Sequence, residues 1–144
     1  MFSKASEYGI RAASYIALQS QLGNRKSVKE IAEVINSPFA FTAKILQVLV
    51  KSDVISSVKG PGGGYEVSPK QFDEINVKMI VKAIDGLEVF SACVLGMNKC
   101  DSRKPCPAHE NYIKVRKELY NMAENTYLKD IISGINSGKT YLNR

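Results

Sequence analysis

The sequence predicts a mostly α-helical fold with one small β-hairpin. Apolar residues recur at three- and four-residue spacing in several stretches, which is typical of helices that pack on a core. One run, Gly60-Pro61-Gly62-Gly63-Gly64, lies between two short stretches of strand character and predicts the turn of the hairpin. At 144 residues the chain is long enough for one domain with a core, or for a small domain plus an appendage.

The first two helices are bounded by cap residues. Residues 3–22 are expected to form a long helix with Ser3 as its N-cap. A second helix is expected after Ser27, because Ser27-Val28-Lys29-Glu30 has the pattern of a capping box. In that motif the Ser and Glu side chains each accept a hydrogen bond from the other residue's backbone N–H. We expect Asn36 to end this helix.

A third helix follows almost at once. Ser37 is expected to be its N-cap and Pro38 its first helical residue, where a missing N–H leaves no hydrogen bond unmade. The positions expected to face the core are Phe41, Ile45, Leu46 and Leu49. The positions expected to point outward are Phe39, Thr42, Ala43 and Lys44. Two short helices joined by a tight turn, the second presenting small, polar and basic side chains, are typical of a helix-turn-helix.

The hairpin that follows predicts a wing. Residues 54–59 and 65–68 have strand character, and the glycines between them let the backbone approach a phosphate or a DNA groove closely. Lys59 adds positive charge at the tip. A glycine-rich turn alone is weak support, but directly behind a helix-turn-helix it predicts a winged helix-turn-helix.

Three further helices are expected after the wing, and the last is a short one that Thr126 caps and that includes Leu128, Ile131 and Ile132. Residues 77–85 form the first, capped by Asn76 and ended by Gly86. The second is a long helix over residues 108–125 with a narrow apolar stripe of Tyr112, Val115, Leu119 and Met122. Because no later segment is large enough to cover this stripe, we expect it to pair with a second copy of the chain. The alternative is that it packs on the first helix of its own chain.

All the cysteines and the only histidine lie in one short stretch. They are Cys93, Cys100, Cys106 and His109. Thiolate and imidazole are the usual protein ligands of zinc and of iron–sulfur clusters, and the turn-forming residues between them favour a loop. Zinc is the less favoured metal, because no CxxC pair is present. The same residues would also suit a cluster-free thiol switch, or a loop without any ligand role.

The charge of the chain favours a polyanionic partner. The formal net charge is +6, and residues 1–70 carry nine Lys and Arg against five Asp and Glu. A basic N-terminal half suits nucleic acid, although a merely basic soluble protein would share this property. No Ser/His/Asp set, phosphate loop or paired carboxylate motif is visible, so we do not expect an enzyme. An electron carrier would not need a basic winged helix.

Sequence signals for export are not apparent. No apolar segment precedes a small-residue cleavage site, and no stretch reaches the length of a membrane span. We therefore expect a cytoplasmic protein with no membrane partner. The odd number of cysteines and a reducing compartment argue against a disulfide framework.

Several of these motifs together resemble one family. They are Ile31-Ala32-Glu33 in the second helix, the wing from Val58 to Tyr65, the helix end Ile84-Asp85-Gly86 and the three-cysteine loop. In combination they are similar to the IscR/NsrR family of bacterial transcription regulators, over nearly the whole chain. The resemblance implies a homodimer that binds an imperfectly palindromic operator in double-stranded DNA and responds to an iron–sulfur cluster.

The resemblance also implies roles for named residues. Cys93, Cys100 and Cys106 would ligate a [2Fe–2S] or [4Fe–4S] cluster. The fourth ligand would be His109, as in IscR-like members, or Glu7, near where NsrR-like members use an acidic residue of the other subunit. The gap between the first two cysteines is one residue longer than in the best-known members, which leaves the cluster type and the sensed signal open.

These inferences together predict three regions and one DNA-binding surface. Residues 1–86 would form the winged helix-turn-helix, residues 87–107 the cluster loop, and residues 108–144 the dimerisation helix and C-terminal tail. The third helix would read base edges, the helix N-termini would hold phosphates and the wing would reach the minor groove. The residues expected to contact DNA are Ser27, Ser37, Phe39, Thr42, Ala43, Lys44, Lys59, Gly60, Gly62 and Tyr65.

Overall fold

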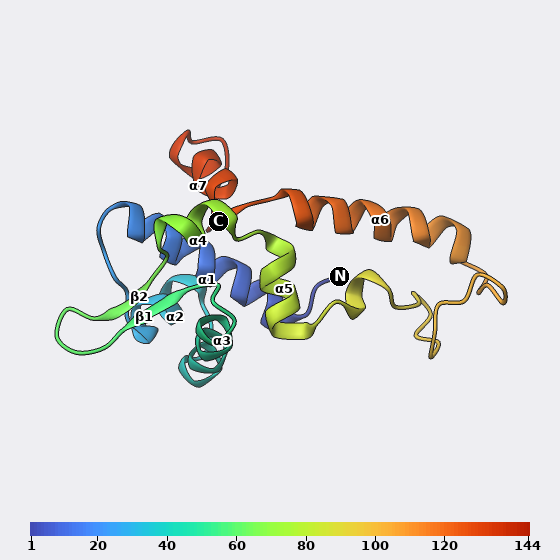
Figure 1. Ribbon diagram of the computed structural model, residues 1–144, viewed down its shortest axis with the longest axis horizontal. Coiled ribbons are helices and arrows are strands. Elements are labelled where there is room, and N and C mark those ends of the chain that lie inside the picture. The colour runs from blue at the N-terminus through green and yellow to red at the C-terminus, as the bar shows by residue number, and fades with distance from the viewer.

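The structure, a computed structural model, describes residues 1–144 as an elongated, mostly helical molecule (Figure 1). Its helices are α1 (Lys4–Gln21), α2 (Val28–Ile35), α3 (Phe39–Lys51), α4 (Pro69–Glu74), α5 (Val77–Asp85), the 3-10 turn η1 (Glu88–Phe90), α6 (His109–Asn125) and α7 (Leu128–Asn136). Its strands are β1 (Ser56–Val58) and β2 (Gly64–Glu66). The predicted fold class, mostly α with a β-hairpin wing, is confirmed. None of the helices combines the length and the apolar character that crossing a membrane requires.

The core is built around α1. This helix packs against α2, α3, α5 and α7, and its buried face carries small side chains that let the neighbours approach. A Cβ atom at Gly9 would overlap the Ile84 side chain, so α1 and α5 meet backbone against side chain at this point. Most of the largest fully buried side chains come from α1, α2, α3, α5 and α7, and they include Ile16, Ile31, Leu46, Ile80 and Ile132. The return of α7 onto α1 therefore makes the C-terminal helix part of the same core.

The cap of α2 has the predicted geometry. The Glu30 backbone N–H donates to Ser27 Oγ at 3.2 Å, and the Ser27 N–H donates to Glu30 Oε1 at 3.2 Å. Asn36 ends the helix in the left-handed region, with φ of 52°, which Asn tolerates better than most side chains. The capping box and the end of α2 are both confirmed.

The start of α3 differs from the prediction. Pro38, not Ser37, occupies the cap position, and no side chain caps the helix there. The Ser37 hydroxyl is buried without a hydrogen-bond partner. Thr42 is completely buried, and its hydroxyl donates to the Pro38 carbonyl at 2.9 Å. The predicted outward orientation of Thr42 is therefore wrong, because that backbone acceptor lets the side chain enter the core.

Phe41 takes the less buried place beside Thr42. It was expected in the core, yet it remains 37% exposed and packs edge-to-face on Tyr8 of α1. The two ring centroids lie 5.8 Å apart at an interplanar angle of 79°. The apolar face of α3 is otherwise as predicted, since Ile45, Leu46 and Leu49 are buried.

The wing is a short antiparallel hairpin. Ser56 pairs with Glu66 and Val58 with Gly64, so each strand is shorter than predicted. Val54 and Ile55, which were assigned to the first strand, instead lie in the core. An isolated bridge joins Tyr65 to Lys26 in the loop before α2, and this bridge fixes the hairpin to the helical core.

One short helix was not predicted. Helix α4 begins after Ser68, whose side chain accepts from the Gln71 N–H at 3.2 Å, while Gln71 Oε1 accepts from the Ser68 N–H at 2.9 Å. Gln71 is buried and its amide nitrogen also donates to the Asp53 carbonyl at 3.2 Å. This side chain therefore ties the end of α3 to the segment that follows the wing.

The long axis of the molecule separates two regions. The wing lies at one end and the loop between η1 and α6 lies at the other, and α6 runs back along the axis toward the core (Figure 1). Asn76 caps α5 as predicted, accepting from the Met79 N–H at 2.9 Å. Helix α6 packs on α5 and η1. The division into regions 1–86, 87–107 and 108–144 stays a prediction.

Candidate DNA-binding surface and cysteine loop

The exposed start of α3 is the candidate DNA-reading surface. Phe39 is 59% exposed, Ala40 and Lys44 are exposed, and Ala43 is half-buried. Small side chains beside an aromatic ring and an ammonium group allow close approach to base edges and phosphate together. The outward orientation predicted for Phe39, Ala43 and Lys44 thus holds, while the one predicted for Thr42 fails.

The wing presents one free cation and several backbone groups. Lys59 is exposed just before the turn. Gly60 and Gly62 have φ values of 89° and 73°, and this left-handed geometry is what makes Gly the suitable residue in the turn. Tyr65 is half-buried and packs on the core, so it supports the base of the wing. The Ser27 side chain is exposed but already engaged by the Glu30 cap.

Arg25 is a wing residue that the sequence analysis missed. Its guanidinium Nε donates to Glu66 Oε2 at 2.8 Å, and its Nη1 donates to the Gly62 carbonyl at 3.4 Å. One side chain therefore joins the loop before α2 to both the second strand and the turn. The basic character of the loop was visible in the sequence, but its partners depend on the register of the hairpin.

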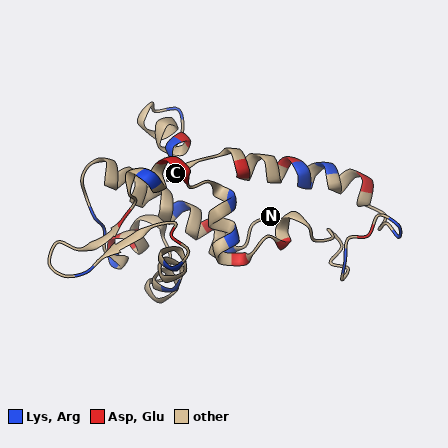
Figure 2. Ribbon diagram, viewed as in Figure 1, with Lys and Arg blue, Asp and Glu red and all other residues tan.

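Basic positions are not confined to the DNA-reading end. Figure 2 shows Lys and Arg on α3 and also on the loop at the opposite end of the molecule. Acidic residues interrupt them along α5 and α6. The net positive charge is therefore spread along the long axis and does not form one block.

The structure brings the predicted ligands together as two pairs. All three cysteines are free and half-buried. Cys100 Sγ lies 3.5 Å from Nδ1 of His109, the buried first residue of α6. Cys106 lies beside Cys93 and helps to lower the pKa of the Cys93 thiol. Three or more His, Cys, Asp or Glu side chains do not meet at any single point.

The surroundings of Cys93 favour a thiolate. Backbone N–H groups of Leu95 and Met97 hold the pKa of the Cys93 thiol below its ordinary value of 9.0. The Cys106 side chain and the positive charge of Arg116 act in the same direction, while partial burial opposes them. Thiolate is the form that binds metal or attacks a disulfide, so the loop stabilises the reactive form of its first cysteine.

Arg116 connects this loop to α6. Its Nη1 donates to the Ser91 and Ala92 carbonyls, each at 2.9 Å. A guanidinium beside thiolates also offsets the negative charge that a thiolate-ligated cluster carries. The donor chemistry therefore fits an iron–sulfur group: three thiols, one imidazole and a neighbouring cation lie on one loop and the helix behind it.

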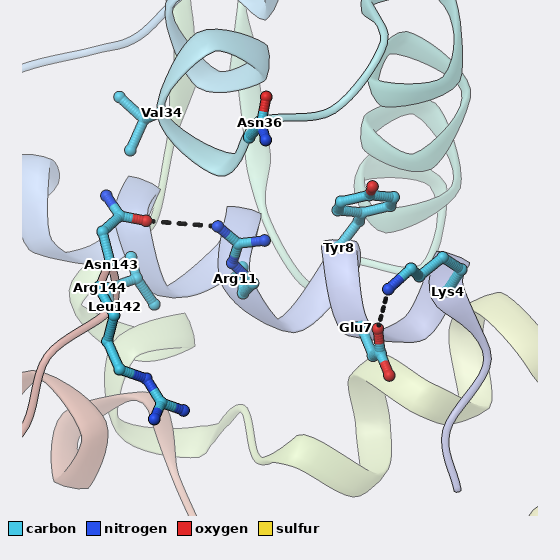
Figure 3. A pocket seen from close by; sticks show the side chains of 9 residues that line it. All are labelled: Lys4, Glu7, Tyr8, Arg11, Val34, Asn36, Leu142, Asn143 and Arg144. Carbon is cyan, nitrogen blue, oxygen red and sulfur yellow. Dashed lines mark hydrogen bonds and ion pairs between the residues drawn. The ribbon is translucent and has the colours of Figure 1, made fainter.

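Glu7 lies on a different surface. Its carboxylate pairs with Lys4 Nζ at 3.2 Å on the exposed first turns of α1. Figure 3 shows it at the edge of a hollow of about 640 Å³ that the C-terminal residues also line. On the other side of this hollow, Arg11 Nη2 donates to Asn143 Oδ1 at 3.3 Å (Figure 3).

The apolar stripe of α6 is only partly covered. Val115 is 48% and Met122 45% exposed, and Tyr112 and Leu119 are half-buried. Toward the core, α6 is held by a polar contact: Lys78 Nζ donates to Glu124 Oε1 at 2.7 Å and to the Tyr120 hydroxyl at 3.1 Å. The structure thus places α6 on α5 and leaves the outer stripe open.

A helix-turn-helix followed by a β-hairpin on a basic chain defines a winged-helix, DNA-binding transcriptional regulator, not an enzyme. The family model Rrf2, described as an iron-dependent transcriptional regulator, matches residues 2–134. The chain belongs to the Rrf2 family.

Sequence relatives carry the names that the resemblance implied. An HTH-type transcriptional regulator of Aquifex aeolicus is 30% identical over 135 residues, which cover 92% of each chain. The HTH-type transcriptional regulator IscR of Pectobacterium atrosepticum is 26% identical over 126 residues, or 88% of this chain and 75% of the relative. NsrR of Oceanobacillus iheyensis is 26% identical over 132 residues, or 90% of this chain and 87% of the relative. The predicted resemblance is confirmed.

Solved structures share the fold. CymR, the global cysteine regulator of B. subtilis, superposes with a TM-score of 0.73 at 22% identity, covering 92% of this chain and 96% of that one. IscR of T. potens superposes with the same TM-score at 19% identity, covering 98% of this chain and 92% of that one. At these identities the likeness concerns the fold alone.

Proposed function

We propose that this protein is a homodimeric regulator whose affinity for operator DNA is set by the state of the cysteine loop. The observation that carries the proposal is the arrangement of the loop: Cys100 contacts His109, Cys93 contacts Cys106, and Arg116 supplies a cation. A regulator that reads DNA with one end and carries reactive thiols at the other has the parts of a sensor. Such a regulator would act in the cytoplasm, where bacterial DNA lies.

The DNA-reading step follows from the exposed start of α3. Phe39, Ala40 and Ala43 would lie near base edges in the major groove, with Lys44 at a phosphate. Lys59 and the Gly60 and Gly62 backbone would approach the adjacent minor groove. Ser37 and Thr42 have no part in this contact, because the hydroxyl of the one and the whole side chain of the other are buried.

Salt dependence tests these contacts. Lys59→Ala should weaken binding to every DNA sequence about equally, and should lower the slope of log affinity against log salt by about one unit. The matched control is Lys139→Ala, which removes an exposed lysine beyond α7. If specific binding survived unchanged after deletion of residues 60–64, the wing would have no role in DNA binding.

Two copies would pair through the outer stripe of α6. This pairing would cover Val115 and Met122 and place two recognition helices about 34 Å apart, one turn of DNA. The operator would then be an imperfect palindrome. A ligand role for Glu7 requires the same pairing, because Glu7 would have to reach the loop of the other copy.

The three thiols and His109 are the residues that would hold a [2Fe–2S] or [4Fe–4S] cluster, with Glu7 of the other copy as the alternative fourth ligand. When bound, such a group supplies a redox-sensitive centre. To bind the cluster, the pair Cys93 and Cys106 and the pair Cys100 and His109 would have to come together around one point. This movement would order the loop between η1 and α6. The 3.5 Å contact of His109 with Cys100 supports His109 as the fourth ligand.

Absorbance of anaerobically purified protein tests this assignment. Cys93→Ala, Cys100→Ala and Cys106→Ala should each abolish the sulfur-to-iron charge-transfer bands, while His109→Ala should leave a labile chromophore. Ser102→Ala, an exposed position on the same loop, is the matched control and should keep the bands. Colourless wild-type protein without iron or sulfide would refute the cluster assignment.

A cluster-free thiol switch is the second candidate, and the contact between Cys93 and Cys106 favours it. Peroxide could oxidise these two thiols to a disulfide, taking two electrons and two protons and releasing water. Solved relatives include an oxidised form of Staphylococcus aureus CymR. Mass spectrometry of peroxide-treated protein separates the two candidates, because a Cys93–Cys106 disulfide in metal-free protein would support the switch.

A further inference from the structure

The start of the chain touches both functional ends of the protein. We define residues 2–8 as the N-terminal bridge. At one end of the bridge, Phe2 packs edge-to-face on Phe90 of η1, with ring centroids 6.3 Å apart at 74°. Phe90 packs in the same way on Tyr120 of α6, with centroids 5.5 Å apart at 87°. Because η1 leads directly into the cysteine loop, a change in the loop reaches Phe2 through Phe90.

The bridge is attached firmly to α5. The hydroxyls of Ser3 and Ser6 both donate to the Asp85 carboxylate, and Ser6 is completely buried. One turn further along α1, Gly9 packs directly against Ile84. These contacts hold the first turns of α1 against the end of α5.

The other end of the bridge meets the recognition helix. Tyr8 packs edge-to-face on Phe41, which lies in the first turn of α3 beside the proposed base-reading positions. Close-packed interiors have low compressibility and transmit displacement from one side chain to the next. A displacement of η1 would therefore change the contact between Tyr8 and Phe41, although the cysteine loop and α3 are not in direct contact.

We propose that the N-terminal bridge carries the state of the cysteine loop to the recognition helix within a single chain. The inference rests on the proposed function only for its input, the change of state in the loop. The N-terminal bridge has contacts at both ends. Phe2 contacts η1, Asp85 holds the bridge against α5, and Tyr8 contacts α3, so a displacement of η1 would be passed to α3. Coupling by such a route is shown by non-additive perturbations.

Amide hydrogen exchange in the full chain tests the relay. Phe90→Leu removes the edge-to-face contacts of Phe90 with both Phe2 and Tyr120. Only the contact with Phe2 lies on the proposed route, and its loss should make the amides of residues 42–46 exchange about 2- to 12-fold faster. Phe72→Leu, which alters a half-buried ring on α4 outside the route, is the matched control and should leave these amides unchanged. The amides of residues 128–132 in α7 report global unfolding and should not change in either variant.

Phe2→Leu supplies the decisive comparison. In a Phe2→Leu background, Phe90→Leu should produce no further acceleration in α3, because the route is already cut. Equal exchange of residues 42–46 in Phe90→Leu and wild type would overturn the relay, as would fully additive effects of the two changes. Operator affinity of wild-type protein with the loop loaded and stripped is measured beside it: equal affinities would refute the proposed sensor, while the exchange result would still decide the relay.

Discussion

Gly64 is the position where a single methyl group should separate the wing from the core. Its φ is +136°, which side chains rarely adopt, and a Cβ atom there would lie 2.8 Å from the Lys26 carbonyl oxygen and 3.2 Å from the Lys26 nitrogen. Those backbone atoms belong to the isolated β-bridge between Lys26 and Tyr65. In it the Tyr65 N–H donates to the Lys26 carbonyl at 2.8 Å, and the Lys26 N–H donates to the Tyr65 carbonyl at 3.2 Å. Gly64→Ala therefore has two effects: it strains the backbone at residue 64, and it displaces the β-bridge between Lys26 and Tyr65.

The expected loss follows from these two effects. A residue forced into a glycine-only conformation costs about 1–3 kcal/mol, and two weakened backbone hydrogen bonds add about 1 kcal/mol each. Gly64→Ala should thus lower the free energy of unfolding by roughly 3–5 kcal/mol. The control is Gly138→Ala, where φ is +73° and nothing lies within 4 Å of a Cβ atom. There only conformational strain applies, about 1–2 kcal/mol.

Urea denaturation at one fixed protein concentration measures both variants. Operator binding by fluorescence anisotropy should also weaken for Gly64→Ala, because the wing loses its attachment, and should be unchanged for Gly138→Ala. If the two variants differed in stability by less than about 0.5 kcal/mol, the close approach of Gly64 to Lys26 would not determine the position of the wing.

Two further predictions concern α6. The Lys78 ammonium lowers the pKa of Glu124 below its ordinary value of 4.5, so this ion pair stabilises the fold above that pH and its contribution is lost as the pH falls further. The free energies of unfolding of wild type and Glu124→Gln should therefore differ near neutral pH and converge in acid. A difference that is constant with pH would contradict the lowered pKa of Glu124. Replacing Leu119 and Met122 with Glu should give a monomer by sedimentation that fails to bind operator, whereas a monomeric wild type at micromolar concentration would remove the dimer proposal.

Local chemistry allowed much of the fold to be predicted from the sequence. The capping box at Ser27 and the cap at Asn76 depend on residues three positions apart, so their geometry follows from the sequence itself. Helix α4 escaped prediction because six residues show too little periodicity, although Ser68 and Gln71 carried a capping-box signal. Phe41 and Thr42 were assigned by hydrophobicity, and the acceptor that lets Thr42 be buried lies on the backbone.

The candidate site was predictable in its residues but not in its arrangement. Three cysteines and a histidine in one turn-rich loop indicated ligand chemistry from composition alone. The pairing of Cys93 with Cys106, and the approach of Arg116 to that pair, depend on how the loop folds back on α6. The contact of Arg25 with Glu66 likewise depends on hairpin register, which residue patterns alone did not reveal.

The most direct test of the sensor proposal is a paired affinity measurement. An operator fragment is first selected from random-sequence DNA, and its affinity is then measured for anaerobically reconstituted protein and for the same protein stripped of iron. We predict a difference of about 5- to 150-fold, the range typical of coupling between two sites. Cys93→Ala protein should show one affinity under both treatments. Equal affinity of the loaded and stripped wild-type protein for every operator tested would contradict control of DNA binding by the cysteine loop.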